Sequence, residues 1–325
     1  MLVAGTGDGA YRVTGLEASA ETKVEKVLEV PRVERVRQFD PVDGVFAATK
    51  EGLYHSPDGT EWTDLKVPEE TVYAVCVDPA GERIYAGTRP THVYASPVPS
   101  GGTDAGPDAY EWRELDGFRE LPSRDDWGVP RHDNIAQVRS LCTHPDAPGR
   151  VVAGVEPGGV HVSEDDGRTW EERKEGVHDD IHELYVVSDG EYLASTGVGL
   201  YRTDDAARSW TRLDEGFDQR YFRAARVHDG VLDASAACVP PNRWENDEAD
   251  PALFESRDGR ELRPVESPRP DEVVVGWTTV EGDLVGATHR GTLLRKRAEE
   301  WSVVGEIPTP DTLPGRYVNL TWVER

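Results

Sequence analysis

One pattern recurs seven times along this 325-residue sequence and limits the folds open to it. It is a short apolar strand that ends in small residues, usually with a final Thr, and is followed by a Gly turn and another strand. The copies lie at 2–6, 46–49, 84–88, 151–155, 192–196, 232–235 and 284–288. Where no insertion intervenes they are spaced by roughly 40 residues, which is the length of one four-stranded β-propeller blade.

A second apolar strand also recurs seven times, at 33–39, 72–77, 137–143, 181–187, 221–227, 273–280 and 317–323. We expect it to be the inner strand of each blade. The seventh copy is C-terminal, whereas the sequence begins on a second strand, so the two ends should share a blade and leave no unpaired inner edge. The prediction is an all-β fold: one domain, 1–325, forming a seven-bladed β-propeller of four-stranded antiparallel blades. Residues 316–325 would supply the inner strand of the first blade, with insertions at 97–136 and 238–252.

An Asp-containing turn precedes the outer strand in several blades. Its fullest copy is 163–170, and shorter or degenerate copies lie at 56–62, 203–210 and 256–262. Asp and Ser/Thr side chains in such turns bond nearby backbone N–H groups, and Gly accommodates a positive φ. We therefore expect structural roles for Ser163, Asp165, Gly167, Trp170, Ser56, Asp58, Trp62, Asp205, Trp210, Ser256 and Asp258. The Trp residues that open the outer strands should pack between blades.

These turns resemble the Asp-box, or bacterial neuraminidase repeat, of sialidases, sortilin-type receptors and the propeller-fold photosystem II assembly factor. Residues 163–170 match the Ser-x-Asp-x-Gly-x-Thr-Trp pattern in full, whereas Ala207 replaces Gly and Leu262 replaces Trp in other copies. The resemblance implies that the Asp-boxes are structural and lie on the face opposite the ligand site.

The sequence is strongly acidic, with 62 Asp+Glu against 36 Lys+Arg and a formal net charge of −26. Such a charge argues against a nucleic-acid partner, because that affinity comes largely from clustered basic residues. Only six of the basic residues are lysine. Dense carboxylates repel one another weakly in molar salt. The composition therefore favours a haloarchaeal type of protein.

Three cysteines, Cys76, Cys142 and Cys238, are widely spaced and predict no disulfide framework. The N-terminus has no basic region and no long apolar run, and no stretch approaches 18 apolar residues. We expect neither a signal peptide nor a membrane span. A cytoplasmic monomer is the default expectation.

Aligned inner strands bring arginines from different blades to one position, near the mouth of the axial channel. The aligned residues are Arg35, Tyr73, Arg139, Glu183, Arg223, Gly276 and Asn319. An arginine cluster can hold a carboxylate or phosphate through paired hydrogen bonds. The alternative is a set of ion pairs between blades, such as Arg139 with Glu183.

The two insertions each carry a Trp outside the repeat positions, among Arg, Asp, Asn and His. Their candidate ligand-binding residues are Trp127, His132, Asn134, Arg243 and Trp244. Loops on a rigid scaffold often bind ligands. The alternative is a solvated insertion whose Trp packs against the blades.

Residues 178–182 contain two histidines four apart, but they lead into a strand rather than a helix. We expect a surface loop and no metal, with His182 as a candidate ligand contact. No phosphate-binding or cofactor motif is present, so we expect no cofactor.

Two functions are compatible with these residues. The first is a non-catalytic binding propeller that holds a protein segment or a small anionic ligand on the face opposite the Asp-boxes. The second is a sialidase-like glycoside hydrolase, in which an arginine cluster holds the substrate carboxylate. Its candidate catalytic residues would be Glu183, Tyr221, Tyr317, Asp125, Asp126 and Asp133. The sequence lacks the Arg-Ile-Pro motif of sialidases near its N-terminus. A shared propeller fold does not by itself specify a shared function. We therefore favour the binding role over the hydrolase.

Overall fold

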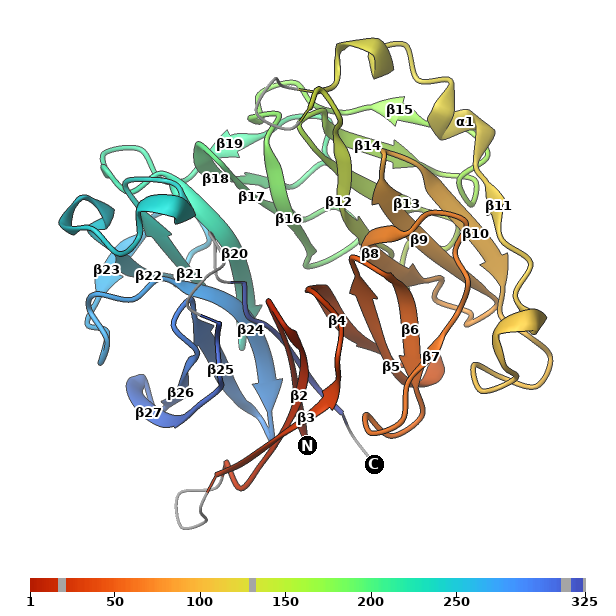
Figure 1. Ribbon diagram of the computed structural model, residues 1–325. Coiled ribbons are helices and arrows are strands. Elements are labelled where there is room, and N and C mark those ends of the chain that lie inside the picture. Colours follow the sequence, from red (N-terminus) through yellow and green to blue (C-terminus); the bar gives the residue numbers. More distant parts are fainter. Residues whose placement is uncertain (17–21, 129–132, 311–316, 324–325) are drawn as a thin grey trace.

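The computed structural model describes residues 1–16, 22–128, 133–310 and 317–323. They form seven four-stranded antiparallel sheets arranged as blades around a common axis, as predicted (Figure 1). The inner strands β4, β8, β12, β16, β20 and β24 surround the centre of the ring in this view. No helix in the described ranges is long and apolar enough to cross a membrane.

Within each blade the strands are named in order from the axis outwards. Blade 1 has β28 (Asn319–Trp322), β1 (Leu2–Thr6), β2 (Gly9–Thr14) and β3 (Lys23–Leu28); blade 2 has β4 (Val33–Phe39), β5 (Val42–Thr49), β6 (Gly52–Ser56) and β7 (Thr63–Asp64). Blade 3 has β8 (Thr71–Val77), β9 (Arg83–Arg89), β10 (Val93–Pro97) and β11 (Arg113–Glu114); blade 4 has β12 (Gln137–Cys142), β13 (Val151–Glu156), β14 (Gly159–Ser163) and β15 (Glu171–Glu172).

Blade 5 has β16 (Ile181–Val186), β17 (Tyr192–Thr196), β18 (Gly199–Thr203) and β19 (Thr211–Arg212); blade 6 has β20 (Tyr221–His228), β21 (Val231–Ala237), β22 (Ala252–Ser256) and β23 (Arg263–Val265). Blade 7 has β24 (Val274–Val280), β25 (Asp283–Thr288), β26 (Thr292–Arg297) and β27 (Glu300–Glu306). The short helices are η1 (Pro107–Ala109), α1 (Asp116–Arg119), η2 (Arg124–Asp126), η4 (Pro241–Arg243) and η5 (Asp247–Ala249).

The recurring small-residue strand is explained by packing between blades. A Cβ atom added to Gly5, Gly87 or Gly154 would lie within 2.6 Å of a Val or Ile from the inner strand of the next blade. These second strands therefore need a very small residue where the neighbouring blade approaches. The Thr that follows closes the turn to the third strand: Thr6 Oγ1 donates to the Gly9 carbonyl over 3.0 Å, and Thr49 repeats the bond to Gly52 over 2.9 Å.

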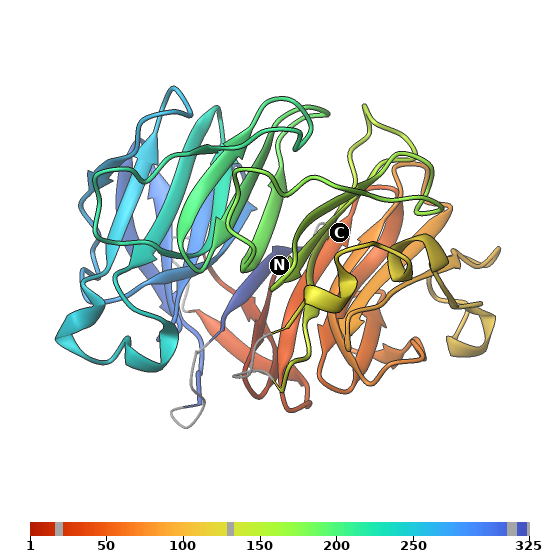
Figure 2. The same ribbon diagram turned by 90° about the horizontal axis from the view of Figure 1, so that it is seen from above.

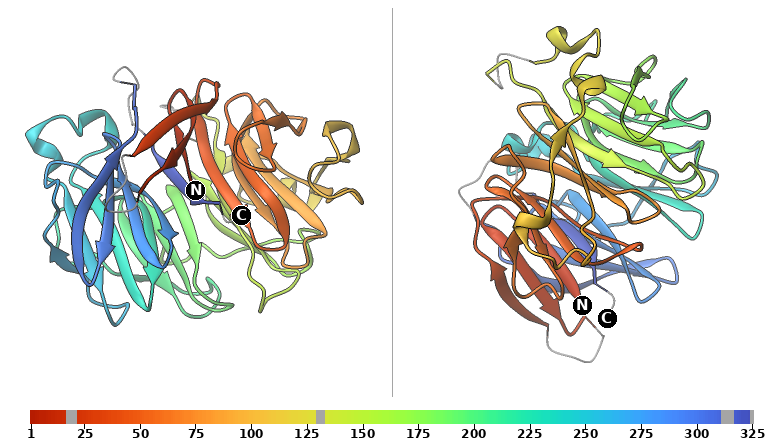
Figure 3. Two further views of the ribbon diagram at one scale, coloured as in Figure 1. Left: turned by 90° about the horizontal axis from the view of Figure 1, so that it is seen from below. Right: turned by 90° about the vertical axis from the view of Figure 1, so that its right-hand side faces the viewer.

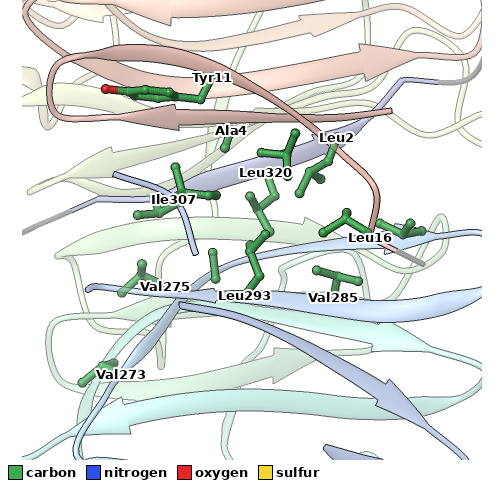
Figure 4. Close-up of a cluster of buried hydrophobic side chains, with 14 of the residues drawn as sticks. Leu2, Ala4, Tyr11, Leu16, Val273, Val275, Val285, Leu293, Ile307 and Leu320 are labelled. Carbon is green, nitrogen blue, oxygen red and sulfur yellow. The ribbon is translucent and has the colours of Figure 1, made fainter. Parts of the chain in front are cut away.

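The hydrophobic core is divided among the spaces between adjacent blades. Figure 4 shows the cluster around blades 1 and 7, where Leu2, Leu320, Leu293 and Val285 face one another. The Trp residues at the outer strands contribute to this packing. Trp210 Nε1 donates to the Arg173 carbonyl of the preceding blade over 3.1 Å, which agrees with the expectation from sequence.

The first and last described strands close the ring. β28 pairs with β1 in a register that runs from Leu2 opposite Trp322 to Gly5 opposite Asn319. The backbones of Met1 and Val323 exchange two further hydrogen bonds, of 2.9 and 2.8 Å. The two chain ends accordingly lie close together (Figure 1). This pairing confirms the predicted closure of the first blade.

The Asp-containing turns are built by side-chain hydrogen bonds. Ser163 Oγ accepts from the Gly167 N–H at 2.8 Å, and Asp165 Oδ1 accepts from the Thr169 N–H at 2.8 Å. In the degenerate copy, Thr203 Oγ1 accepts from the Ala207 N–H at 3.1 Å. Ala207 adopts the same left-handed conformation as Gly167, with φ of 69° against 84°. The turn geometry thus persists where the glycine is lost.

The strand connections lie on two faces of the ring, because strands alternate in direction within each blade (Figure 2). We call the face with the Asp-containing turns the hairpin face and the other the opposite face.

The predicted insertion 97–136 is divided by β11 into two parts that lie on different faces of the ring. Residues 98–112 precede β11 on the hairpin face, where Thr103 Oγ1 donates to the Asp43 carbonyl over 2.9 Å. The residues after β11 connect it to β12 on the opposite face. Residues 98–119, which follow β10 and end with α1, run along the outside of the ring (Figure 3).

Closure predicts that Leu320→Ala destabilises the entire ring. Leu320 is 2% exposed in the cluster between blades 1 and 7, and such a truncation costs about 2–5 kcal/mol. Chemical denaturation measures the loss, and Val303→Ala on the exposed face of β27 is the control, with an expected change of about 0.5 kcal/mol or less. Deletion of 316–325 should prevent stable folding, and unchanged melting of that truncated chain would contradict the closure.

The left-handed Ala207 predicts an unusually small cost for a substitution in the core. Ala207 is buried in a hydrophobic cluster, but Ala207→Gly should change the free energy of unfolding by only about 0.5 kcal/mol or less, because relief of the positive φ offsets the lost methyl and the entropy of glycine. Gly167→Ala should lower the free energy of unfolding, since the added Cβ would meet Leu115 Cδ1 at 2.4 Å. Both changes are measured by urea denaturation, and an Ala207→Gly variant destabilised by about 1.5 kcal/mol, the cost without strain, would refute the strain assigned to this turn.

Candidate functional site

The side chains of the inner strands fill the axis of the ring. Each inner strand starts at the opposite face and ends at the hairpin face, because the connection from the previous outer strand lies on the opposite face. Residues early in these strands therefore face one end of the axial channel, and later residues face the other end. The aligned residues predicted from sequence all lie near the start of their strands.

An ion pair crosses the channel between blades that are not neighbours. Arg35 on β4 reaches Glu183 on β16, with 2.6 Å between Nη1 and Oε1. Its Nη2 donates to the Arg139 carbonyl over 3.1 Å. Arg37, two residues along β4, binds the same Glu183 oxygen at 2.7 Å. We call the Arg35–Glu183 pair the crossbar.

The crossbar is shielded from water. The exposed fraction of the side chain is 13% for Arg35 and 11% for Glu183. Burial lowers the pKa of Arg35 to about 10, although Glu183 acts in the opposite direction. Arg35 stays charged at neutral pH. Removing one partner of such a pair typically costs about 3–5 kcal/mol, because it leaves a buried charge without compensation.

At the end towards the opposite face, arginines surround Tyr317. The guanidinium carbons of Arg223, Arg32 and Arg139 lie 3.9, 4.1 and 5.2 Å from the centre of its ring. Burial raises the pKa of the Tyr317 phenol, but Arg223, Arg139 and Arg32 outweigh it and hold that pKa below its ordinary value. The electrostatic potential at the phenol is therefore positive.

The three arginines differ in their acidic partners. Arg139 Nε lies 3.3 Å from Glu156 Oε2, and Arg32 Nε lies 3.0 Å from Glu34 Oε1. Arg223 makes no ion pair or hydrogen bond with the residues that the structure describes, and its guanidinium stacks on Tyr317. Ion pairs between blades involve Arg35, which binds Glu183, and also Arg139, whose Nη1 lies 3.8 Å from Glu34 Oε2 of blade 2. Glu183 is bound by Arg35 and Arg37 rather than by Arg139.

Glu156, Asp180 and His182 lie beside this cluster, and one ligand atom of each falls within 4.8 Å of the others. His182 Nδ1 is 2.6 Å from the Phe222 carbonyl, so the hydrogen sits on Nδ1 and Nε2 presents a lone pair. Burial, aided by Arg223, lowers the pKa of His182 to about 3. These N and O donors are of the types that bind divalent ions. Arg139 already supplies positive charge at Glu156, and we assign no metal here.

The insertion tryptophans pack against buried histidines. The Trp127 ring lies 4.8 Å from that of His161, and the Trp244 ring lies 5.2 Å from that of His289. Their indole N–H groups donate to Ser123 Oγ over 3.0 Å and to the Val239 carbonyl over 2.8 Å. Both tryptophans thus anchor their insertions to the blades.

The other insertion candidates do not reach the channel cluster. Asn134 is exposed in a left-handed turn, Arg243 pairs with Glu248, and Asp126 is exposed in η2. Asp133 is 90% exposed and lies 3.8 Å from Arg89. His132 lies outside the described residues. Tyr221 does reach the channel, where its ring packs 4.7 Å from His182 and burial raises the pKa of its phenol.

Arg32, Arg37, Glu34 and Arg226 also point to the channel, although the aligned position did not include them. Arg37 and Arg226 follow Arg35 and Arg223 on the same strands, so the period of two identifies Arg37 from the sequence. Register shifts interrupt the inner strands, between Val33 and Arg35 and between Phe222 and Ala225. These bulges prevent a simple alternation from assigning Glu34 and Arg226.

No protein-family model matches the chain, and no curated protein matches its sequence. Similar solved structures are found among propellers. An ancestral GH74 enzyme is 14% identical over 88% of this chain, with a TM-score of 0.57, and this chain spans 38% of that enzyme. The WD40 β-propeller domain of Doa1 is 16% identical, with 86% of this chain and 82% of that chain covered and a TM-score of 0.57.

The structure of YCF48 bound to D1 peptide is also similar, with 14% identity, 83% of this chain and 84% of that chain covered, and a TM-score of 0.54. Enzymes and peptide-binding proteins therefore share this architecture. At these identities the likeness establishes the propeller fold alone.

The buried histidines predict a loss of stability in mild acid. Burial lowers the pKa of both His161 and His289 to about 4 from 6.5. Below pH 6.5 the unfolded chain therefore takes up protons that the folded chain does not. The free energy of unfolding should fall by about 1.4 kcal/mol per pH unit for each histidine between pH 6.5 and 4.

Urea denaturation at pH 7, 6 and 5 measures this slope. His161→Gln removes one titrating group and should make the slope shallower by about one proton. A slope identical to that of the unsubstituted chain would show that His161 does not titrate in this way.

Proposed function

We propose that this chain is a non-catalytic binding propeller that holds an anionic group of a protein segment or small molecule. The site is at the end of the axial channel towards the opposite face. The observation that carries this proposal is Arg223, a guanidinium without a carboxylate partner among the described residues, beside Arg139 and Arg32 around Tyr317. An incoming carboxylate or phosphate would supply the missing partner.

The charge of the whole chain makes this local positive potential significant. With a formal net charge of −26, a random site on the surface would repel an anion. Burial and nearby carboxylates both raise the pKa of a phenol, whereas the pKa of Tyr317 is lowered. The arginines at this end of the channel thus favour anions where the rest of the chain repels them.

The channel geometry favours binding over glycoside hydrolysis. Glu183, a candidate catalytic carboxylate, is shared by Arg35 and Arg37 and lies in the crossbar. Asp126 and Asp133 are exposed in the insertion, away from the arginines. Glu183, Asp126 and Asp133 are therefore not placed as a pair of carboxylates on either side of a bond held by these arginines.

A sialidase-like hydrolase is the second candidate, and Tyr317 is the observation that favours it. A phenol with a lowered pKa amid arginines is a better nucleophile than an ordinary tyrosine. Glu156 contributes to the electrostatics of this phenol, as a paired carboxylate would.

The proposal includes two further statements about the protein. The Asp-containing turns are Asp-boxes, and the protein works in the salt-rich cytoplasm of a haloarchaeal type of cell.

Anion binding at Arg223 predicts a specific loss of affinity. Two probes represent the two ligand classes: inorganic phosphate, measured by calorimetry, and a labelled Glu-containing peptide with its Gln counterpart, measured by fluorescence anisotropy. Arg223→Gln should weaken phosphate or the Glu peptide by roughly tenfold or more, because a hydrogen bond to a charged group contributes about 1.5–3 kcal/mol. Arg263→Gln, an exposed arginine on β23, is the matched control.

Two outcomes would count against this proposal. Equal binding of the Glu and Gln peptides, together with no phosphate binding, would remove the role of the anion. If the chain hydrolyses a fluorogenic sialoside and a folded Tyr317→Phe variant does not, the hydrolase function would be supported in place of the binding function. Circular dichroism melting establishes that each variant is folded.

A further inference from the structure

A pocket of about 210 Å³ lies at the other end of the axial channel, towards the hairpin face. Its lining comes from the later residues of the inner strands of blades 2 to 6. Arg37 and Arg226 provide charge, and Phe39, Leu141 and Leu184 provide apolar walls. Arg35 of the crossbar lines the inner end of this pocket.

Two guanidinium groups line this pocket, and each contacts a side chain of β16. Arg37 Nη2 binds Glu183 at 2.7 Å, and the guanidinium carbon of Arg226 lies 4.7 Å from the centre of the Tyr185 ring. Glu183 and Tyr185 are two residues apart on β16, so they lie on the same face at a separation of about 7 Å. Arg37 and Arg226 come from blades 2 and 6, and both contact side chains of blade 5.

The pocket has more positive than negative charge. Glu183 is shared by Arg35 and Arg37, which leaves one carboxylate for two guanidiniums. Arg226 forms no ion pair with any residue in the described ranges, and its Nε is buried without a hydrogen-bond partner there. A desolvated polar group without a partner costs free energy. An anion in the pocket would remove that cost.

The size and walls of the pocket restrict the ligand. Pockets for drug-sized molecules usually measure about 300–1,000 Å³, so this one takes a smaller molecule. The apolar side chains beside Arg37 and Arg226 favour a compact apolar body over a fully polar one. The two cations favour a carboxylate or phosphate group, which accepts hydrogen bonds from both.

We propose that this pocket is a second binding site, specific for a small organic anion that presents an oxyanion to Arg37 and Arg226. Its apolar body would lie against Phe39 and Leu184. The site is separated by the crossbar from the arginines around Tyr317. It depends on different residues from the site proposed at Arg223, and either site can exist without the other.

Calorimetric titration at low ionic strength with benzoate, acetate and benzamide separates the contributions to binding. Benzoate combines charge with an apolar body, acetate has the charge alone, and benzamide is the neutral counterpart. Benzoate should bind more tightly than either of the others. Arg226→Gln should weaken benzoate by roughly tenfold or more, and Arg226→Lys should retain part of the affinity because it keeps the charge.

Arg263→Gln is the control and should leave benzoate affinity unchanged. Arg223→Gln separates the two sites: it should remove only benzoate binding at the Arg223 site and leave the binding component that Arg226→Gln removes. Equal affinity for benzoate and benzamide, an unchanged affinity in folded Arg226→Gln, or no benzoate binding at millimolar concentration would each overturn the proposal.

Discussion

The pairing of β28 with β1 is the constraint on which the rest of the structure depends. Each blade buries its faces against two neighbours, so an open ring would leave apolar surface and an unpaired strand edge in blade 1. The four paired positions from Leu2–Trp322 to Gly5–Asn319 remove that edge. Gly5 lies within this pairing and also receives Val33 of the next blade. Gly5 therefore serves both the closure of the ring and the packing of blade 1 against blade 2.

The ring separates charges according to radius. The chain has a formal net charge of −26, but arginines from several blades are directed towards the axis. Five of the outer strands have only two or three residues, each exposed or half-buried, as in β15 and β19. Arg35, Arg139 and Arg223 instead stand on inner strands, where Arg35 and Arg139 are largely buried with Glu183 and Glu34. This arrangement explains how an acidic protein can present positive potential in its interior.

The sequence was sufficient to predict the fold because the constraints repeat. The Gly of the second strand, the Thr of the following turn and the Ser–Asp pair of 163–170 each make a local contact that recurs around the ring. The predicted inner strand 33–39 coincides with β4, and the C-terminal strand is shorter than predicted, with β28 limited to Asn319–Trp322. Val323 follows β28 and still bonds to the backbone of Met1.

The candidate site was harder to predict, because its contacts cross the ring. Alignment found Arg35 and Glu183, but it could not show that blades 2 and 5 meet through them. The bulge between Phe222 and Ala225 likewise hides the direction of Arg226. Trp127 and Trp244 were prominent in sequence as polar-loop aromatics, yet their positions are explained by packing on His161 and His289. Residue types in the sequence thus identified the candidates, but the contacts that each one makes depend on how the blades are arranged around the ring.

The crossbar also has a consequence for passage through the ring. A solute entering the axis would meet a desolvated ion pair, with Arg35 further bound to the Arg139 carbonyl, instead of a column of water. Displacing either partner would expose an uncompensated charge. Movement of a solute along the axis from one face to the other would therefore require this buried ion pair to break.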